Sequence, residues 1–219
     1  MLPFGEIFAL KELVRFPLHA QRLLKMPRGD GRVVVVFPGF STGDEFLVPL
    51  RLGLNKLGYA AVGWGQGRNR GDVAGNLDAC IRYAEAKVED SGRKAALIGW
   101  NLGGVFAREI ARDRPDLVSR VITFGTPLNG PPPSVADRVY SPEELDEIHT
   151  AIDERDHTPI SVPVTAMYSR ADRIVDWKAC VDHRTPGVEN IEISSTHVGM
   201  GIDPDVWKTI ADRLAAEPR

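Results

Sequence analysis

Residues 95–104 of this chain read Ala-Ala-Leu-Ile-Gly-Trp-Asn-Leu-Gly-Gly. The apolar run from Ala95 to Ile98 predicts a buried strand, and the residues from Val105 to Ala111 have the pattern of a helix. Glycines at positions 99, 103 and 104 lie around the junction, where small residues are needed because the turn is tight and the helix starts directly beneath the sheet. A strand, a glycine-rich turn and a helix in this order indicate an α/β protein with a parallel sheet.

Position 101, at the centre of this turn, is an asparagine. The spacing resembles the nucleophile elbow G-x-S-x-G, on which α/β-hydrolases carry their serine. The central residue of such an elbow usually has a positive φ, which asparagine tolerates better than most other residues with a side chain. Asn101 can therefore keep the turn while the hydroxyl nucleophile is lost. The alternative is an ordinary glycine-rich turn between a strand and a helix.

The composition is that of one globular domain, residues 1–219, with 43% hydrophobic and 26% charged residues. A net charge of −3 without a basic patch argues against a nucleic-acid partner. The cysteines, Cys80 and Cys180, fit no metal-binding or redox spacing, so we expect two buried thiols rather than a disulfide. No apolar run approaches the ~18 residues of a membrane span and no signal peptide is recognisable, so a cytoplasmic location is expected.

Residues 1–28 form an N-terminal segment with a helical pattern, in which apolar residues are interleaved with lysines and arginines. Pro17 is expected to break or bend this helix. Because the apolar residues are spread over both halves of the pattern, we expect the segment to pack over the sheet edge or over the mouth of the site. The alternative is a helix on a membrane surface, which would make the protein peripheral to a membrane.

After this segment, apolar runs of strand length alternate with helical patterns, which predicts a doubly wound parallel sheet. The expected strands are 33–37, 59–64, 95–98, 120–124, 162–168 and 189–193. Helices are expected over 44–57, over 71–89, from the turn to about residue 113, and from an N-cap at Asp203 followed by Pro204.

The stretch 131–160 departs from this alternation. Three successive prolines, at 131–133, lead to the capping box Ser141-Pro142-Glu143-Glu144, which predicts an acidic helix to about Asp156. Hydrolases of this class carry a lid at this point of the chain. We expect either a small lid or a connecting helix here.

Two polar residues directly follow expected strands, at the strand ends where ligands bind in open parallel sheets. Asp172 follows the strand 162–168, and His197 follows the strand 189–193. In α/β-hydrolases the nucleophile, the acid and the histidine occur in this order along the chain, so Asn101, Asp172 and His197 are the candidate catalytic positions. Asp176 is a competing acid, and a solvated loop acid and a structural histidine are the simpler alternatives. The other histidines are expected on the surface or in local structural roles: His19, His149, His157 and His183.

An acyl-transfer site also needs N–H donors for the oxyanion. One donor would be the backbone N–H of Leu102, directly after the nucleophile position. The other would come from the loop after the first strand, where Phe40 is preferred and Ser41 is the competitor. A simple Pro-Gly turn is the alternative explanation of this loop.

From about residue 29 to its end, the chain resembles small α/β-hydrolases of the lipase/esterase type. The resemblance implies a reduced α/β-hydrolase fold that lacks the first two strands of larger relatives. It also implies hydrolysis of carboxylic esters, often of lipid-like acyl substrates, without a metal or an organic cofactor. The matching stretches are the elbow, Val36–Phe40, Gly63–Gly65 with Gly67–Asn69, Val121–Pro127, Tyr168–Asp172, and Glu189–Glu192 leading to His197.

The chain departs from this family at position 101, which puts its activity in doubt. A carboxamide nitrogen is a poor nucleophile, so we expect little or no ester hydrolysis. The chain is then an esterase whose serine has been exchanged, a non-catalytic relative that binds an acyl or lipid ligand, or a scaffold. A further account is deamidation of Asn101 to aspartate, the nucleophile of dehalogenase and epoxide-hydrolase relatives, although spontaneous deamidation is expected to be slow beside the bulky Leu102. Ser41 or Thr42 could substitute as nucleophile only from the oxyanion loop, away from the elbow.

Overall fold

The computed structural model describes residues 25–132, 136 and 138–216. Within them, six strands form one parallel sheet in the order β2-β1-β3-β4-β5-β6. The doubly wound parallel sheet expected from the sequence is therefore confirmed. The strands are β1 (Val33–Phe37), β2 (Ala60–Gly63), β3 (Ala95–Trp100), β4 (Val118–Phe124), β5 (Val164–Ser169) and β6 (Glu189–Ile193).

Helices connect these strands, and two of their starting points were predictable from local sequence. Ser141 Oγ accepts from the Glu144 N–H while the Glu144 carboxylate accepts from the Ser141 N–H, which is the predicted capping box. The Asp203 side chain caps the last helix by accepting from the Asp205 N–H. The helices are α3 (Val48–Leu57), α4 (Val73–Ser91), α5 (Leu102–Asp113), α7 (Pro142–Asp156), α8 (Trp177–Cys180), the 3-10 helix η1 (Gly199–Gly201) and α9 (Pro204–Ala215).

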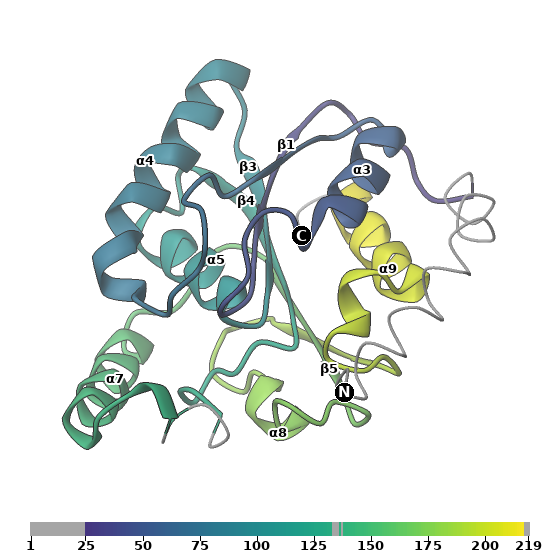
Figure 1. Cartoon of the computed structure of the whole chain (residues 1–219). Helices are drawn as coiled ribbons and strands as arrows, with labels where there is room; N and C mark the ends of the chain where they lie inside the picture. Colours follow the sequence, from purple (N-terminus) through teal and green to yellow (C-terminus); the bar gives the residue numbers. More distant parts are fainter. Residues whose placement is uncertain (1–24, 133–135, 137, 217–219) are drawn as a thin grey trace.

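The alternation of side chains along the strands divides the core into two layers. Val34 and Val36 of β1 belong to the cluster with α3 and α9, whereas Val33 and Val35 belong to the cluster with α4 and α5. Figure 1 shows the same division, with α4 and α5 on one side of the sheet and α3 and α9 on the other. Strands β1 and β3 are buried along their whole length, as expected for strands covered on both faces.

Some boundaries differ from the prediction. Helix α3 begins at Val48 rather than at residue 44, because the Asp44 carboxylate accepts from the N–H groups of Trp64 and Gly65 and so serves the loop after β2. Strand β5 begins at Val164 rather than at residue 162; it starts directly after a proline, which has no N–H to give to a neighbouring strand. Strand β3 continues beyond Ile98 to Trp100, so it ends directly at the elbow.

The order of the strands reverses at β1, which lies between β2 and β3. In open parallel sheets, a crevice forms at such a reversal, outside the carboxyl ends of the strands. The loop after β1 carries Phe40, and the turn after β3 carries Asn101. The two segments singled out in the sequence therefore meet at the place where this fold binds ligands.

The elbow is a steep turn with very close backbone packing. Asn101 has a φ of 52° and a ψ of −127°. A Cβ atom at Gly99 would overlap the Cα of Gly104, and a Cβ atom at Gly103 would overlap the carbonyl oxygen of Phe37. Backbone atoms cannot rotate away as a side chain can, so α5 packs this closely on the sheet only because these positions are glycines.

Gly99→Ala is expected to lower the free energy of unfolding by about 3 kcal/mol, at the upper end of the usual cost of overpacking. The reason is that α5 must move as a whole to admit the methyl group. Urea unfolding followed by circular dichroism measures this change. Gly201→Ala is the matched control, because its Cβ would meet only side-chain ends, the nearest being Leu47 Cδ2 at 3.2 Å. Equal stability of the two variants would contradict the packing argument.

The predicted N-terminal helix falls almost entirely on residues 1–24, which lie outside the described residues. Of the part of the chain that the structure describes, no helix has both the length and the apolar character needed to span a membrane.

Candidate active site

His197 and Asp172 form a buried pair beyond the carboxyl ends of β6 and β5. His197 Nδ1 lies 2.6 Å from Asp172 Oδ2. A carboxylate only accepts hydrogen bonds, so Nδ1 carries the proton and Nε2 carries a lone pair. Asp172 Oδ1 accepts from the backbone N–H groups of Ile174 at 2.8 Å and Val175 at 2.9 Å. These bonds hold the carboxylate in place against the imidazole.

The side-chain amide of Asn101 lies between this imidazole and the loop after β1. Its Nδ2 is 3.0 Å from His197 Nε2, and its Oδ1 accepts from the Phe40 N–H at 3.1 Å. Only this orientation of the amide pairs a donor with an acceptor at both ends, because the Phe40 N–H can only donate. The structure thus brings together the side chains of Asn101, His197 and Asp172 and the backbone of Phe40.

The loop after β1 distinguishes the two oxyanion candidates by their contacts. The Phe40 N–H points at position 101, whereas the Ser41 N–H donates to the carbonyl of Asn69 at 2.7 Å. Leu102 is the first residue of α5, so its N–H has no partner within the helix. Gly39 lets the loop approach the elbow, since a Cβ atom there would lie 2.9 Å from the Cβ of Asn101.

Asn69, for which the sequence suggested no role, holds this loop in position. Its Nδ2 donates to the Pro38 carbonyl at 2.9 Å and its Oδ1 accepts from the Gly71 N–H at 3.2 Å. Its backbone N–H also donates to the Thr42 carbonyl at 2.8 Å. The sequence shows Asn69 only as one of several polar residues between Gly67 and Gly71, and the structure shows that its side chain is buried. Its partner Pro38 is 31 residues away along the chain, so no local pattern could pair the two.

Asn69→Ala is expected to lower the free energy of unfolding by about 1–3 kcal/mol, because the Pro38 carbonyl and the Gly71 N–H would be left unpaired. Chemical denaturation measures the loss. Asn76→Ala is the control, since Asn76 Nδ2 donates to the Asp72 carbonyl at an exposed position. If Asn69→Ala costs no more than Asn76→Ala, the loop after β1 does not depend on Asn69.

Two neighbours fix the position of His197. Trp100 Nε1 donates to the carbonyl oxygen of His197 at 3.1 Å, and the Trp100 ring is itself stacked on Phe46, with 4.4 Å between the ring centroids. Gly125, at the end of β4, leaves room for the imidazole, because a Cβ atom there would lie 3.2 Å from His197 Cε1. These contacts hold the imidazole of His197 so that its Nε2 faces Asn101.

The competing polar residues make other contacts. Asp176 caps α8 by accepting from the Lys178 N–H at 3.0 Å. The Thr42 hydroxyl donates to the Gly39 carbonyl at 2.8 Å. The remaining histidines lie elsewhere: His149 is next to Gly130, His157 Nδ1 is 2.8 Å from the Asp153 carbonyl, His183 is exposed, and His19 is outside the described residues.

The cysteines take no part in this arrangement. Cys80 and Cys180 are free and buried, and burial raises the pKa of each thiol to about 12. Neither is therefore a reactive thiolate at neutral pH. Among the residues that the structure describes, no cluster of His, Cys, Asp and Glu side chains could hold a metal ion.

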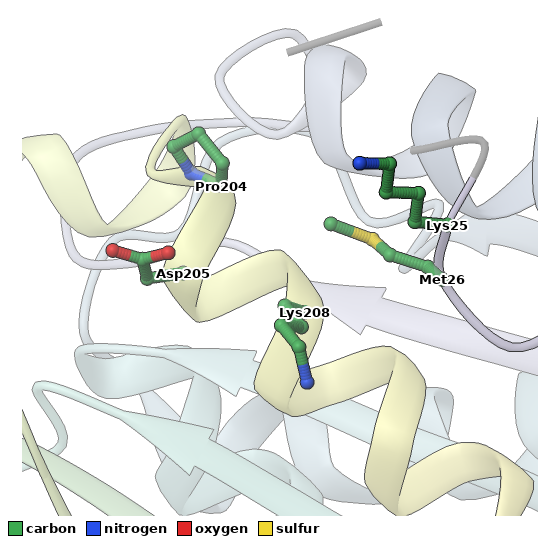
Figure 2. A pocket seen from close by; sticks show the side chains of 5 residues that line it. All are labelled: Lys25, Met26, Pro204, Asp205 and Lys208. Carbon is green, nitrogen blue, oxygen red and sulfur yellow. The ribbon is translucent and has the colours of Figure 1, made fainter. Parts of the chain in front are cut away.

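A depression on the surface lies at the start of α9, where Lys25, Met26, Pro204, Asp205 and Lys208 line it (Figure 2). None of these residues belongs to the group around His197. The ammonium group of Lys208 is already paired with Asp212 at 2.5 Å. We assign the depression no catalytic role.

No protein-family model and no curated protein matches this sequence. Among solved structures, the chain is similar to Paleococcus ferrophilus monoacylglycerol lipase, with 16% identity, a TM-score of 0.63, and coverage of 86% of this chain and 96% of that one. It is also similar to Aspergillus fumigatus lipase B, with 19% identity, a TM-score of 0.65, and coverage of 87% and 55%. A third similar structure is the enol-lactonase from Burkholderia xenovorans, with 14% identity, a TM-score of 0.59, and coverage of 85% of this chain and 92% of that one. At these identities the likeness shows the fold, and the chain has the α/β-hydrolase fold.

Proposed function

We propose that this chain is built as a carboxylic ester hydrolase of the serine type, in which Asn101 replaces the nucleophile and leaves little or no hydrolysis. The substrate would be a small-molecule ester or a lipid-like ester. The observation that carries this proposal is the unbroken series of contacts from Asp172 through His197 to the side chain at position 101. The α/β-hydrolase fold supports it, because one structural neighbour is a monoacylglycerol lipase.

The proposed chemistry is acyl transfer. A serine hydroxyl at position 101 would give its proton to His197 Nε2 and attack the ester carbonyl, while Asp172 keeps the imidazole in the required tautomer. The N–H groups of Phe40 and Leu102 would stabilise the oxyanion. An amide nitrogen cannot take the place of that hydroxyl, because its lone pair is delocalised into the carbonyl group.

A second candidate function is non-catalytic binding of an acyl or lipid ligand. The Phe40 N–H, one of the two proposed oxyanion donors, is already bonded to Asn101 Oδ1, which favours a site that no longer turns over. An acyl ligand that co-purifies with the chain, together with no ester turnover even after serine is introduced, would favour this function over the first. A third possibility, a scaffold that binds a partner through its outer surface, has no comparable contact among the described residues to support it.

The test of the proposed function is covalent labelling of Asn101→Ser by a fluorophosphonate probe, which reacts with a serine that an imidazole activates. We expect labelling of the folded variant, and none of the unchanged chain or of the variant after unfolding in urea. A well-folded Asn101→Ser protein that takes up no probe would refute the role proposed for this site.

Two further parts of the proposal concern residues 131–160 and the compartment. We propose that Tyr140 covers the oxyanion loop. Tyr140 and Phe40 both lie beside Gly71, where a Cβ atom would be 2.5 Å from the Tyr140 hydroxyl and 3.1 Å from the Phe40 ring. Helix α7 would anchor this cover, since Arg155 pairs with Glu109 and Asp113 on α5.

We place the whole chain, as one domain, in the cytoplasm, with membrane-surface contact through residues 1–28 as the alternative.

A further inference from the structure

The side-chain amide of Asn101 lies between a hydrogen-bond donor and a base. Its carbonyl oxygen Oδ1 meets a donor, 3.1 Å from the Phe40 nitrogen, and its nitrogen Nδ2 meets a base, 3.0 Å from His197 Nε2. We infer that Asn101 is a site of self-modification, at which water hydrolyses the side-chain amide to the carboxylate of aspartate with His197 as the catalytic residue. This inference depends on the amide and the imidazole and does not require that the site takes an ester.

One contact polarises the amide carbonyl in the direction that hydrolysis needs, and the other places a base beside the amide. The Phe40 N–H stabilises the negative charge that develops on Oδ1 when a nucleophile adds to Cγ. Asp172 keeps a proton on Nδ1 of His197, so Nε2 can take up a second proton and return it. Asn101 and His197 are both buried, and in these surroundings such contacts act more strongly than they would in water.

The reaction balances as amide plus water giving carboxylate plus ammonium. The bond from Nδ2 to Nε2 first opens, which frees the Nε2 lone pair. Water then adds to Cγ while one of its protons passes to Nε2, and the carbonyl electron pair moves onto Oδ1. The imidazolium then gives its proton to Nδ2, the carbonyl bond re-forms, and the Cγ–Nδ2 bond breaks with its electron pair on nitrogen. The ammonia that leaves takes up the proton of the new carboxylic acid.

The elbow disfavours the ordinary route of asparagine deamidation, in which the next backbone nitrogen attacks Cγ and closes a succinimide ring. That nitrogen belongs to Leu102, the first residue of α5. The Asn101 carbonyl accepts from the Gly104 N–H at 3.0 Å, which holds the intervening peptide in the start of the helix. Hydrolysis by water is therefore expected to give aspartate alone, whereas a succinimide would open to a mixture containing isoaspartate.

The experiment follows two asparagines of the same chain. Trypsin cleaves after lysine and arginine, so Asn101 falls in the peptide Ala95–Arg108 and Asn129 in the peptide Val121–Arg138, each the only asparagine of its peptide. Asn129 is exposed and precedes Gly130, whose missing Cβ eases succinimide closure, so it serves as an internal clock for spontaneous deamidation. The folded protein is incubated at neutral pH, and mass spectrometry measures aspartate and isoaspartate at both positions over time.

Two variants remove the base in different ways. His197→Gln deletes the imidazole. Asp172→Asn keeps an oxygen for the Ile174 and Val175 N–H groups but turns a donor toward Nδ1, so the ring proton moves to Nε2 and the base is lost. His157→Gln is the matched control, because it removes an exposed imidazole at the end of α7.

Conversion of Asn101 to aspartate is expected to be at least about tenfold slower in His197→Gln and in Asp172→Asn than in the unchanged chain. His157→Gln is expected to convert like the unchanged chain, and Asn129 is expected to convert at one rate in all four proteins. If one of the two site variants does not fold by circular dichroism, the other decides. The inference is overturned if Asn101 stays intact in the unchanged chain while Asn129 converts. It is also overturned if Asn101 converts equally in all folded variants, or if isoaspartate forms at position 101.

Discussion

Serine at position 101 is expected to raise the kcat for p-nitrophenyl acetate hydrolysis by about 10³- to 10⁶-fold over the unchanged chain. Removing the nucleophile of a serine protease costs about 10⁶-fold, of which this exchange would recover a large part. The physical reason is that the side chain at position 101 already lies 3.0 Å from His197 Nε2, so a hydroxyl there would have its base within reach. Spectrophotometric release of p-nitrophenol measures the rate.

Variants in the same background identify the source of that rate. Asn101→Ala is expected to gain nothing, because it offers no nucleophile. Adding Asp172→Asn to Asn101→Ser is expected to reduce kcat by about 10⁴-fold, since the imidazole would take the wrong tautomer. A gain in Asn101→Ala as large as that in Asn101→Ser would show that another residue attacks, and the proposed role of position 101 would be wrong.

Asp182→Asn is expected to lower the free energy of unfolding by about 3–5 kcal/mol, the cost of removing one partner from a buried ion pair. Arg108 of α5 and Asp182, in the loop between α8 and β6, approach to 2.8 Å, with side chains only 7% and 1% exposed. An amide oxygen at position 182 can still accept from the N–H groups of Arg184 and Thr185, as Oδ1 does now. The guanidinium would keep its bond to the Thr185 hydroxyl at 3.0 Å but lose its anionic partner, so the loss reports on the buried charge.

The same ion pair sets an acid limit on stability. Burial by itself would raise the pKa of Asp182, but the Arg108 guanidinium and the bonds from Thr185 and Arg184 outweigh it and lower this pKa to about 2, from an ordinary value of 3.8. Because the pKa is lower in the folded state, the contribution of Asp182 is complete above the unfolded value and is lost as the pH falls through about 2.

Urea unfolding of the unchanged chain and of Asp182→Asn, repeated from neutral to strongly acid pH, measures both effects. The difference between the two proteins is expected to shrink as the pH falls from about 4 to about 2. Asp116→Asn is the control, because Asp116 pairs with Arg114 at 2.8 Å with its side chain 61% exposed, and exposed pairs contribute less than about 1 kcal/mol. A difference that stays constant with pH would contradict the role of the Asp182 charge.

The sequence predicted the features that are encoded within one short stretch. The β1 strand Val33–Phe37 could be predicted because a continuous apolar run of this length suits a strand buried on both faces. The start of α7 could be predicted because the reciprocal bonds of Ser141 and Glu144 depend on a spacing within one turn. The elbow at Asn101 falls in the same class, since its glycines and its strand are contiguous.

What the sequence could not provide depends on contacts between distant segments. Asp172 and Asp176 both follow β5, and only the folded chain shows that the first faces His197 while the second caps α8. The sequence favoured Phe40 over Ser41, but the contact that occupies the Ser41 N–H comes from the Asn69 carbonyl in the loop after β2, which no local pattern reveals. The buried pair of Arg108 and Asp182 has no local signal at all, since each residue taken alone resembles an ordinary surface charge.

The backbone at position 101 has a φ of 52°, which limits the residue types that can occupy this position without distorting the elbow. Its ψ of −127° lies outside the left-handed helical region that asparagine enters at small cost, so the close packing of the elbow holds this residue in a strained conformation. The asparagine codons AAC and AAT differ from the serine codons AGC and AGT in a single base. One nucleotide therefore separates an asparagine from a serine at this bend. Under the proposed function, a single base change at this codon would be enough to exchange the nucleophile while every other residue of the elbow stays the same.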